Sequence, residues 1–349
     1  MNPFNRASPR ARIVRRSLAR TSAIFMAAGV ALFSMVLLFG LYGPTAAQDA
    51  QSFPNKPVRI FVPYGPGGVA DVTMRLLAQK LSENTGQQFI IENRPGAGGS
   101  LSARGALSAD PDGYSLAVTG NGQAISMTLF KARTYDVLTD FTQVSITATF
   151  EMLLAVKNDS PFKNLQDVID FARKNPGKLN LGVINPGSTQ NLSAHLFKQT
   201  TGAEVTIIPF KTTPEVVTAI LRGDVHMGFD FYAGLQGAIT DKQLRIVATS
   251  GERRNPLLKD VPTAVESGLP NYVVTSWNGL ASRAGLPDPI LRKLNKLIVT
   301  ALEDPALRDK ALKLGMDARG STPEEMRDRM ARDIVRWRGV IEKANLASE

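Results

Sequence analysis

Short apolar runs alternate with amphipathic segments along the chain from about residue 57 to residue 241. The first apolar run, over 57–62, stops at a glycine-proline turn, and a segment of helical period follows over 69–84 and ends at Gly86. A strand that leads directly into an amphipathic helix is the repeating unit of α/β proteins. Repetition of this unit predicts mostly parallel sheets with helices on both faces.

The same pattern predicts the other elements. Strands are expected over 57–62, 88–91, 114–118, 143–149, 153–156, 179–183, 204–208, 225–229 and 244–249. Helices are expected over 69–84, 100–108, 165–174, 190–201, 287–302, 305–314 and from Pro214 onward. A capping box, Thr322-Pro323-Glu324-Glu325, predicts the start of a last helix, so the C-terminal part is expected to be mainly helical.

Polar or glycine-containing loops follow four of the predicted strands, after Val62, Val118, Val183 and Ile208. In α/β sheets, ligands bind beyond the carboxyl ends of the strands. The loop at 64–68 stands directly before a helix, whose first N–H groups and dipole favour an anion. An ordinary tight turn between a strand and a helix, without a bound ligand, would have the same sequence pattern. Because two of these loops fall in each half, the chain is expected to form two α/β lobes that face a common cleft.

The first 47 residues have the pattern of a secretory signal peptide. Six arginines and no acid lie in residues 1–20, residues 21–48 carry no charge, and the segment from Ile24 to Tyr42 is strongly apolar. Small residues precede a cleavage point between Ala47 and Gln48, which predicts export to the periplasm by the Sec route. The apolar run is long enough to span a bilayer, so a retained membrane anchor is the alternative.

Charge and residue inventory exclude several classes of function. The formal charge of +10 falls to 10 − 6 = +4 without the leader, and aromatic residues are not interleaved with basic clusters, so nucleic-acid binding is not expected. The chain has no cysteine, which excludes a disulfide framework, a thiolate metal site and a cysteine nucleophile. With two histidines in all, a periplasmic hydrolase is the less favoured rival of a binding protein.

No cofactor or metal is predicted. The glycine-rich segment over 96–101 lacks the last glycine of a dinucleotide fingerprint, and the chain contains no P-loop motif. His226 and Asp230 would share one face of a strand, but no third metal ligand lies near them in the sequence.

Motifs spread in order over residues 53–345 resemble the Bug family, the TctC-like substrate-binding proteins of tripartite tricarboxylate transporters. The motifs are Pro63-x-x-Pro-Gly-Gly-x-x-Asp71-x-x-x-Arg75, Glu92-Asn93-Arg94-Pro95-Gly96-Ala97-Gly98-Gly99, Ala109-x-Pro111-Asp112-Gly113-Tyr114, Pro209-Phe210-Lys211, Asp260-Val261-Pro262-Thr263, Ser276-Trp277 and Gly320-Ser321-Thr322-Pro323-Glu324-Glu325.

This resemblance implies a type II periplasmic binding protein with two α/β lobes and a ligand cleft between them. Lobe one would comprise residues 53–150 plus 276–349, and lobe two residues 151–275. Such a protein is not an enzyme: it would bind a small di-, tri- or aromatic carboxylate as a monomer. It would deliver the ligand to membrane subunits similar to TctA and TctB, or present it to a periplasmic sensor.

The resemblance also implies which residues bind the ligand, through backbone amides, hydroxyls and bridging waters. They are Tyr64, Gly65, Gly67, Gly68, Asp71, Thr119, Gly120 and Asn121 in lobe one and Ser188, Thr189, Lys211, Thr212, Thr213 and Asp230 in lobe two. Asp71 stands four residues before Arg75, so it is expected either to pair with that arginine or to face the ligand. Tyr64 and Gly65 depart from the aromatic or apolar residue and the proline that are usual in the family.

Overall fold

The structure is a computed structural model that describes residues 51–96, 99–130 and 133–346. The predicted signal peptide and its alternative, a retained anchor, lie outside the described residues. Among the residues described, no helix is both long enough and apolar enough to cross a membrane. The elements below all belong to the compact unit that begins at Ser52.

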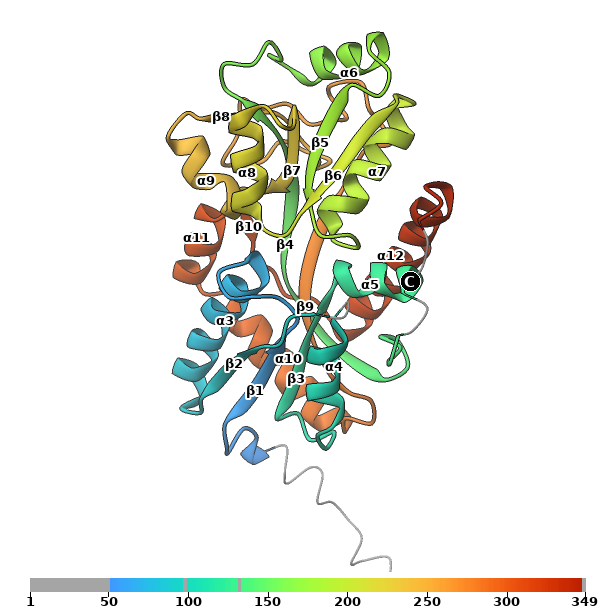
Figure 1. Ribbon diagram of the computed structural model, residues 1–349. Coiled ribbons are helices and arrows are strands. Elements are labelled where there is room, and N and C mark those ends of the chain that lie inside the picture. Colours follow the sequence, from blue (N-terminus) through green and yellow to red (C-terminus); the bar gives the residue numbers. More distant parts are fainter. Residues whose placement is uncertain (1–50, 97–98, 131–132, 347–349) are drawn as a thin grey trace, which may run out of the picture. The chain divides into compact units, whose positions relative to one another are not determined.

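Two sheets share one long strand, β4 (Figure 1). The first sheet has the order β2-β1-β3-β9-β4, with β10 also paired to β4. The second has the order β4-β7-β5-β6, with β8 also paired to β4. The strands are β1 (Val58–Val62), β2 (Phe89–Asn93), β3 (Ser115–Gly120), β4 (Phe141–Lys157), β5 (Leu179–Ile184), β6 (Val205–Phe210), β7 (Met227–Phe231), β8 (Leu244–Thr249), β9 (Thr275–Arg283) and β10 (Met316–Asp317).

The expectation of mostly parallel sheets is correct only for the outer strands. Pairs β1·β2, β1·β3, β5·β6 and β5·β7 are parallel, as alternating βα units require. The strands in the middle are antiparallel, because β9 runs opposite to both β3 and β4, and β4 runs opposite to β7 and β8. Strand β9 was missed in a segment that was expected to be mainly helical; its residues are buried on both faces, so they show no period of two.

The predicted strands over 143–149 and 153–156 are one continuous strand of 17 residues, β4. Glu151 still pairs with Thr275 of β9 in the first sheet, whereas Met152 pairs with Phe231 of β7 in the second. The chain therefore changes sheet without leaving the extended conformation.

Most predicted helices are present with small shifts at their ends, and the capping box at Thr322 is formed by both of its hydrogen bonds. Two helices, α5 and α9, were not predicted; α5 is buried on most sides, so it lacks an amphipathic period. The helices are α3 (Val69–Thr85), α4 (Ser100–Leu107), α5 (Asn121–Leu129), α6 (Leu165–Lys174), α7 (Thr189–Thr201), α8 (Thr213–Arg222), α9 (Tyr232–Thr240), α10 (Asp288–Leu302), α11 (Pro305–Lys313) and α12 (Pro323–Lys343).

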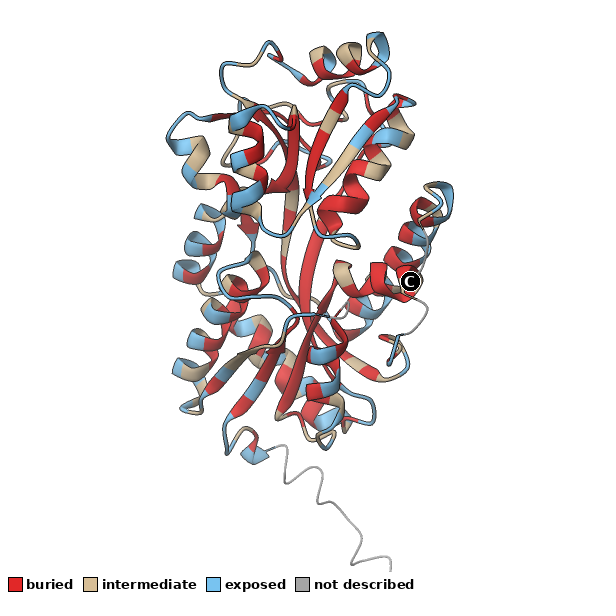
Figure 2. Cartoon of the chain, viewed as in Figure 1, coloured by how far each residue is buried: buried red, intermediate tan, exposed pale blue. Residues whose placement is uncertain are grey.

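Burial is concentrated in the central strands and on the inner faces of the helices (Figure 2). Both tryptophans, Trp277 on β9 and Trp337 on α12, are among the largest fully buried side chains. Each donates its indole N–H to another side chain, Trp277 to Asp333 and Trp337 to Asn121. Polar partners therefore fix the C-terminal helix on the first sheet in addition to apolar packing.

Candidate functional site

The buried carboxylate of Asp71 holds the loop between β1 and α3. Its Oδ2 accepts from the backbone N–H of Gly67 and from Arg75 Nε, both at 2.9 Å, and its Oδ1 accepts from Asn93 Nδ2 at 2.9 Å. Burial opposes ionisation, but these hydrogen bonds and the charge of Arg75 outweigh it and hold the pKa of Asp71 below its usual value. Of the two expected roles, the structure contains the ion pair with Arg75.

This arrangement exposes the start of α3. Gly67 has a φ of +81°, which favours glycine, and its N–H is already used by Asp71. Gly68 is the N-cap residue with φ −74° and ψ 166°, a conformation open to any residue, and residues 64–68 are exposed. The first N–H groups of a helix have no intrahelical acceptor, so this end of α3 can bind an anion through the N–H groups that follow Gly67.

Tyr64 bridges this loop to the first turn of α5. The residue is 41% exposed, yet its hydroxyl lies so close to Gly122 that a Cβ at Gly122 would collide with it. Burial raises the pKa of Tyr64, and a hydrogen bond with Gln123 partly opposes that shift. The hydroxyl is thus enclosed against the first turn of α5, although the residue as a whole is partly exposed.

The predicted glycine loop after Val118 is wrong. Thr119 and Gly120 belong to β3, and α5 begins at Asn121 with no intervening loop. The side chain of Thr119 is buried, and its hydroxyl lies 3.4 Å from Gln143 Oε1 on β4. Gly120 packs against the carbonyl oxygen of Trp277 so closely that any side chain would clash, so this position requires glycine.

Ser188 and Thr189 begin α7, and their hydroxyls bond to protein groups. Ser188 Oγ accepts from the backbone N–H of Asn191 at 3.1 Å and donates to the carbonyl of Ile184 at 2.7 Å, so Ser188 is the N-cap. Thr189 Oγ1 accepts from Asn121 Nδ2 at 3.0 Å. This hydrogen bond joins the first turn of α5 to the first turn of α7.

Asp230, the last predicted residue, lies inside β7 and is 3% exposed. It accepts from Gln190 Nε2 at 3.0 Å, Thr213 Oγ1 at 2.5 Å and the N–H of Phe231 at 2.8 Å. Burial raises the pKa of Asp230 and these hydrogen bonds partly oppose the shift. Asp230 therefore ties the first turns of α7 and α8 to β7, while Thr212 caps α8 through the N–H of Glu215.

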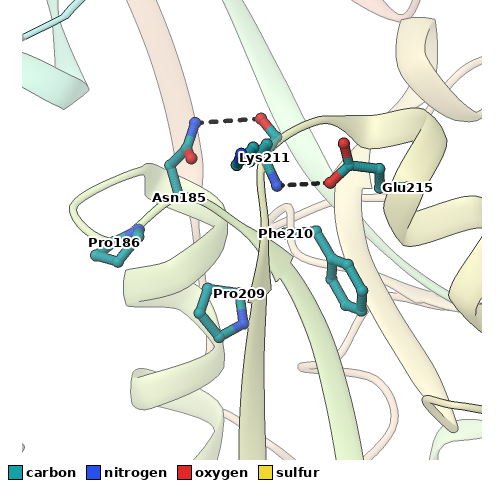
Figure 3. Close-up of a pocket in the computed structure, with 6 residues that line it drawn as sticks. All are labelled: Asn185, Pro186, Pro209, Phe210, Lys211 and Glu215. Atoms are coloured by element: carbon teal, nitrogen blue, oxygen red, sulfur yellow. Dashed lines mark hydrogen bonds between the residues drawn. The ribbon is translucent and has the colours of Figure 1, made fainter.

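An open pocket of about 470 Å³ lies at the carboxyl ends of β5 and β6 (Figure 3). Of the predicted site residues it contains Lys211, whose backbone N–H donates to Glu215 Oε2 at 2.9 Å and whose carbonyl accepts from Asn185 Nδ2 at 3.3 Å. The carboxylate of Glu215 beside Lys211 lowers the attraction of this pocket for an anion. Within the described residues, no hydrogen bond joins Lys211–Thr213 to the Tyr64–Gly68 segment.

Some residues that form hydrogen bonds with the predicted site residues were not themselves predicted. Gln123 and Gln190 carry no sequence signal, because their roles depend on Tyr64 and Asp230, which are distant in sequence. Asn93 stands in a motif that the family resemblance includes, so it could have been nominated. His226 immediately precedes β7, so it does not share a strand face with Asp230, and its Nδ1 accepts from the N–H of Asn180. No group of three or more possible metal ligands occurs in the described parts of the chain.

Two sheets that share the long strand β4, with helices around them and helix N-termini at the strand ends, define a type II periplasmic binding protein. Residues 73–346 match the model of the tripartite tricarboxylate transporter family receptor, TctC, and the chain belongs to this family. Protein BugT of Bordetella pertussis is 29% identical over 301 residues, which cover 86% of this chain and 92% of BugT.

Solved structures agree with this assignment. The structure of R. palustris Rpa4515 with adipate has a TM-score of 0.78 and 32% identity, and the match covers 85% of this chain and all of that one. MatC from Rhodopseudomonas palustris with bound malate has a TM-score of 0.73 and 29% identity, with 83% of this chain and 100% of MatC covered. The family is therefore one of substrate-binding proteins with carboxylate-bound members.

Proposed function

We propose that this protein binds a small di-, tri- or aromatic carboxylate in the periplasm, without turning it over, and delivers it to the membrane subunits of a tripartite transporter. The observation that carries the proposal is the start of α3, where Asp71 fixes Gly67 and exposes the N–H groups that follow. Relatives of the same fold were solved with adipate and with malate, which supports a carboxylate as the ligand class.

The proposed site uses helix N-termini from both sheets. Gly65, Gly68 and Tyr64 would contact the ligand from the loop before α3, with N–H groups of α7 and α8 and Lys211 opposite. Partial positive charge at helix N-termini and direct N–H donors suit a carboxylate, and water can bridge the remaining distances.

In this proposal, residues 53–150 plus 276–349 form one lobe and residues 151–275 the other. The lobes would move at the places where β4 changes sheet and where the chain enters β9. Ser250 spans these two places, because its hydroxyl accepts from the N–H of Met152 at 2.9 Å and donates to the carbonyl of Val274 at 2.5 Å. We expect the leader to be cleaved before Gln48, which would release the protein into the periplasm. We also expect the released protein to be a monomer.

Thermal unfolding of the exported protein with a panel of carboxylates tests the binding proposal. The panel contains adipate, malate, citrate and benzoate, and adipamide is the matched neutral control for adipate. A ligand at 100 times its Kd stabilises the folded state by about 2.7 kcal/mol, so at least one acid should raise the Tm while adipamide should not. No shift with any acid would contradict carboxylate binding, and a mass starting at Gln48 would establish the cleavage.

A further inference from the structure

Three buried side chains from three helices form one hydrogen-bonded chain. Trp337 of α12 donates its indole N–H to Asn121 Oδ1 at 2.7 Å, and Asn121 Nδ2 donates to Thr189 Oγ1 at 3.0 Å. The exposed fractions are 1% for Trp337, 2% for Asn121 and 6% for Thr189. Hydrogen bonds at this depth are costly to break, because a buried donor or acceptor then loses its partner without gaining water.

This chain of side chains links the two sheets. Asn121 follows β3 of the first sheet, and Thr189 follows β5 of the second (Figure 1). Thr189 Oγ1 also lies 3.4 Å from Ser276 Oγ near the start of β9, where that strand enters the first sheet. The contact therefore lies between helix ends that would separate if the two sheets moved apart.

The backbone around Asn121 leaves little room for adjustment. Gly120 rests on the carbonyl of Trp277, and no loop separates β3 from α5, so the position of Asn121 is set by the sheet. Trp337 then fixes the orientation of the amide by using its oxygen, which turns the NH₂ group toward Thr189. An indole donor requires an acceptor, so this orientation of the amide is determined by chemistry.

We infer that Asn121 and Thr189 position the two lobes and do not contact the ligand directly. Their hydrogen bond, with Asn121 oriented by Trp337, forms an interlobe latch. The latch holds the N-terminus of α7 against the first turn of α5, and so sets the distance between the two walls of the proposed site. The inference rests on the proposed function, because a latch between lobes controls binding only if the ligand lies between them.

The matched variants Thr189→Val and Thr189→Ser test the latch. Valine has the shape of threonine but no hydroxyl, whereas serine keeps the hydroxyl. Hydrogen exchange of the two indole N–H groups is measured in the ligand-free exported protein by NMR, and Trp277, bonded to Asp333 at 2.6 Å, is an internal reference. We expect Thr189→Val to speed exchange at Trp337 about tenfold while Trp277 and the serine variant stay near wild type.

Equal acceleration at both tryptophans would indicate general destabilisation and would overturn the latch, as would unchanged exchange at Trp337. The second readout is the Kd for adipate, or for the acid that stabilises the protein most in the panel. Thr189→Val should weaken binding about tenfold through faster dissociation, and Thr189→Ser should not. If no acid binds the wild type, the proposed function fails, but the hydrogen-exchange result still tests whether the latch exists. If Thr189→Val and Thr189→Ser have equal Kd values, the latch does not position the binding site.

Discussion

The backbone N–H of Gly67 donates to the carboxylate of Asp71 at 2.9 Å, four residues further along the chain. The same carboxylate binds Arg75 and Asn93, so one buried acid holds the β1–α3 loop, the first turns of α3 and the end of β2 together. An acid at the N-terminus of a helix also interacts favourably with the helix dipole. The acidic residue nearest the proposed anion site thus organises that site.

Asp71→Asn should therefore destabilise the protein by about 1–3 kcal/mol at pH 7, since the charge-assisted hydrogen bonds of a buried carboxylate are lost. Because the folded pKa of Asp71 is lowered, its contribution is present above the unfolded pKa of about 3.9 and disappears as the pH falls through the folded value. Urea unfolding should show a smaller difference between wild type and variant at pH 3 than at pH 7. Arg75→Gln, at an arginine side chain that is 53% exposed, should cost less. Equal stability of wild type and Asp71→Asn at both pH values would count against this role.

Gly68→Asp should abolish or strongly weaken carboxylate binding without unfolding the protein. The backbone of Gly68 accepts any side chain, the nearest atom to a new Cβ is 3.7 Å away, and aspartate is a good N-cap residue. The new charge would repel a bound carboxylate, so affinity should fall at least tenfold, or about 1.4 kcal/mol. Gly68→Asn has the same size without the charge and should retain more affinity. Calorimetric titration decides, and equal losses in the two variants would indicate crowding alone.

Gly122→Ala should disturb Tyr64, because the added methyl group would collide with the phenol hydroxyl. Crowding of this kind typically costs about 1–3 kcal/mol. Adding Tyr64→Phe should restore most of the loss, since the nearest remaining ring atom, Cζ, lies at an ordinary 3.5 Å from the new Cβ. Denaturant unfolding of the two single variants and the double variant measures the coupling. Additive effects would show that the two residues do not touch as described.

Stability should fall between neutral pH and pH 5 because of two histidines. Burial lowers the pKa of His226, and burial followed by the charge of Lys198 lowers that of His195. For a base whose pKa is lowered in the folded state, the unfolded state takes up protons first as the pH falls. The histidines therefore contribute fully to the free energy of unfolding above about pH 6.5, and this contribution declines below that pH. His226→Asn keeps an acceptor near the N–H of Asn180 and should reduce this slope. Urea unfolding of the wild type, His226→Asn and His195→Asn at pH 5, 6 and 7 measures how stability changes with pH. If the slope is the same in both variants as in the wild type, the two histidines do not cause it.

The sequence predicted the elements whose signals are local. Helix α6 was placed at its observed bounds. The capping box at Thr322 marked the start of α12, and Pro214 marked the start of α8 to within one residue. These signals depend on neighbours three or four residues away, so they do not require the rest of the fold. Family membership was likewise evident from motifs distributed along the chain.

Elements defined by their surroundings were missed or misplaced. Strand β9 and helix α5 are buried on most sides and show no periodic pattern, and β4 continues through a sheet change that looks like a break in sequence. The proposed site divides in the same way. Sequence nominated the glycine turn at 64–68 and the starts of α7 and α8, because helix ends are local features. Only the tertiary structure decided that Asp71 binds Gly67, that Tyr64 reaches Gly122, and that Asn121 joins Trp337 to Thr189, because those contacts depend on packing between distant segments.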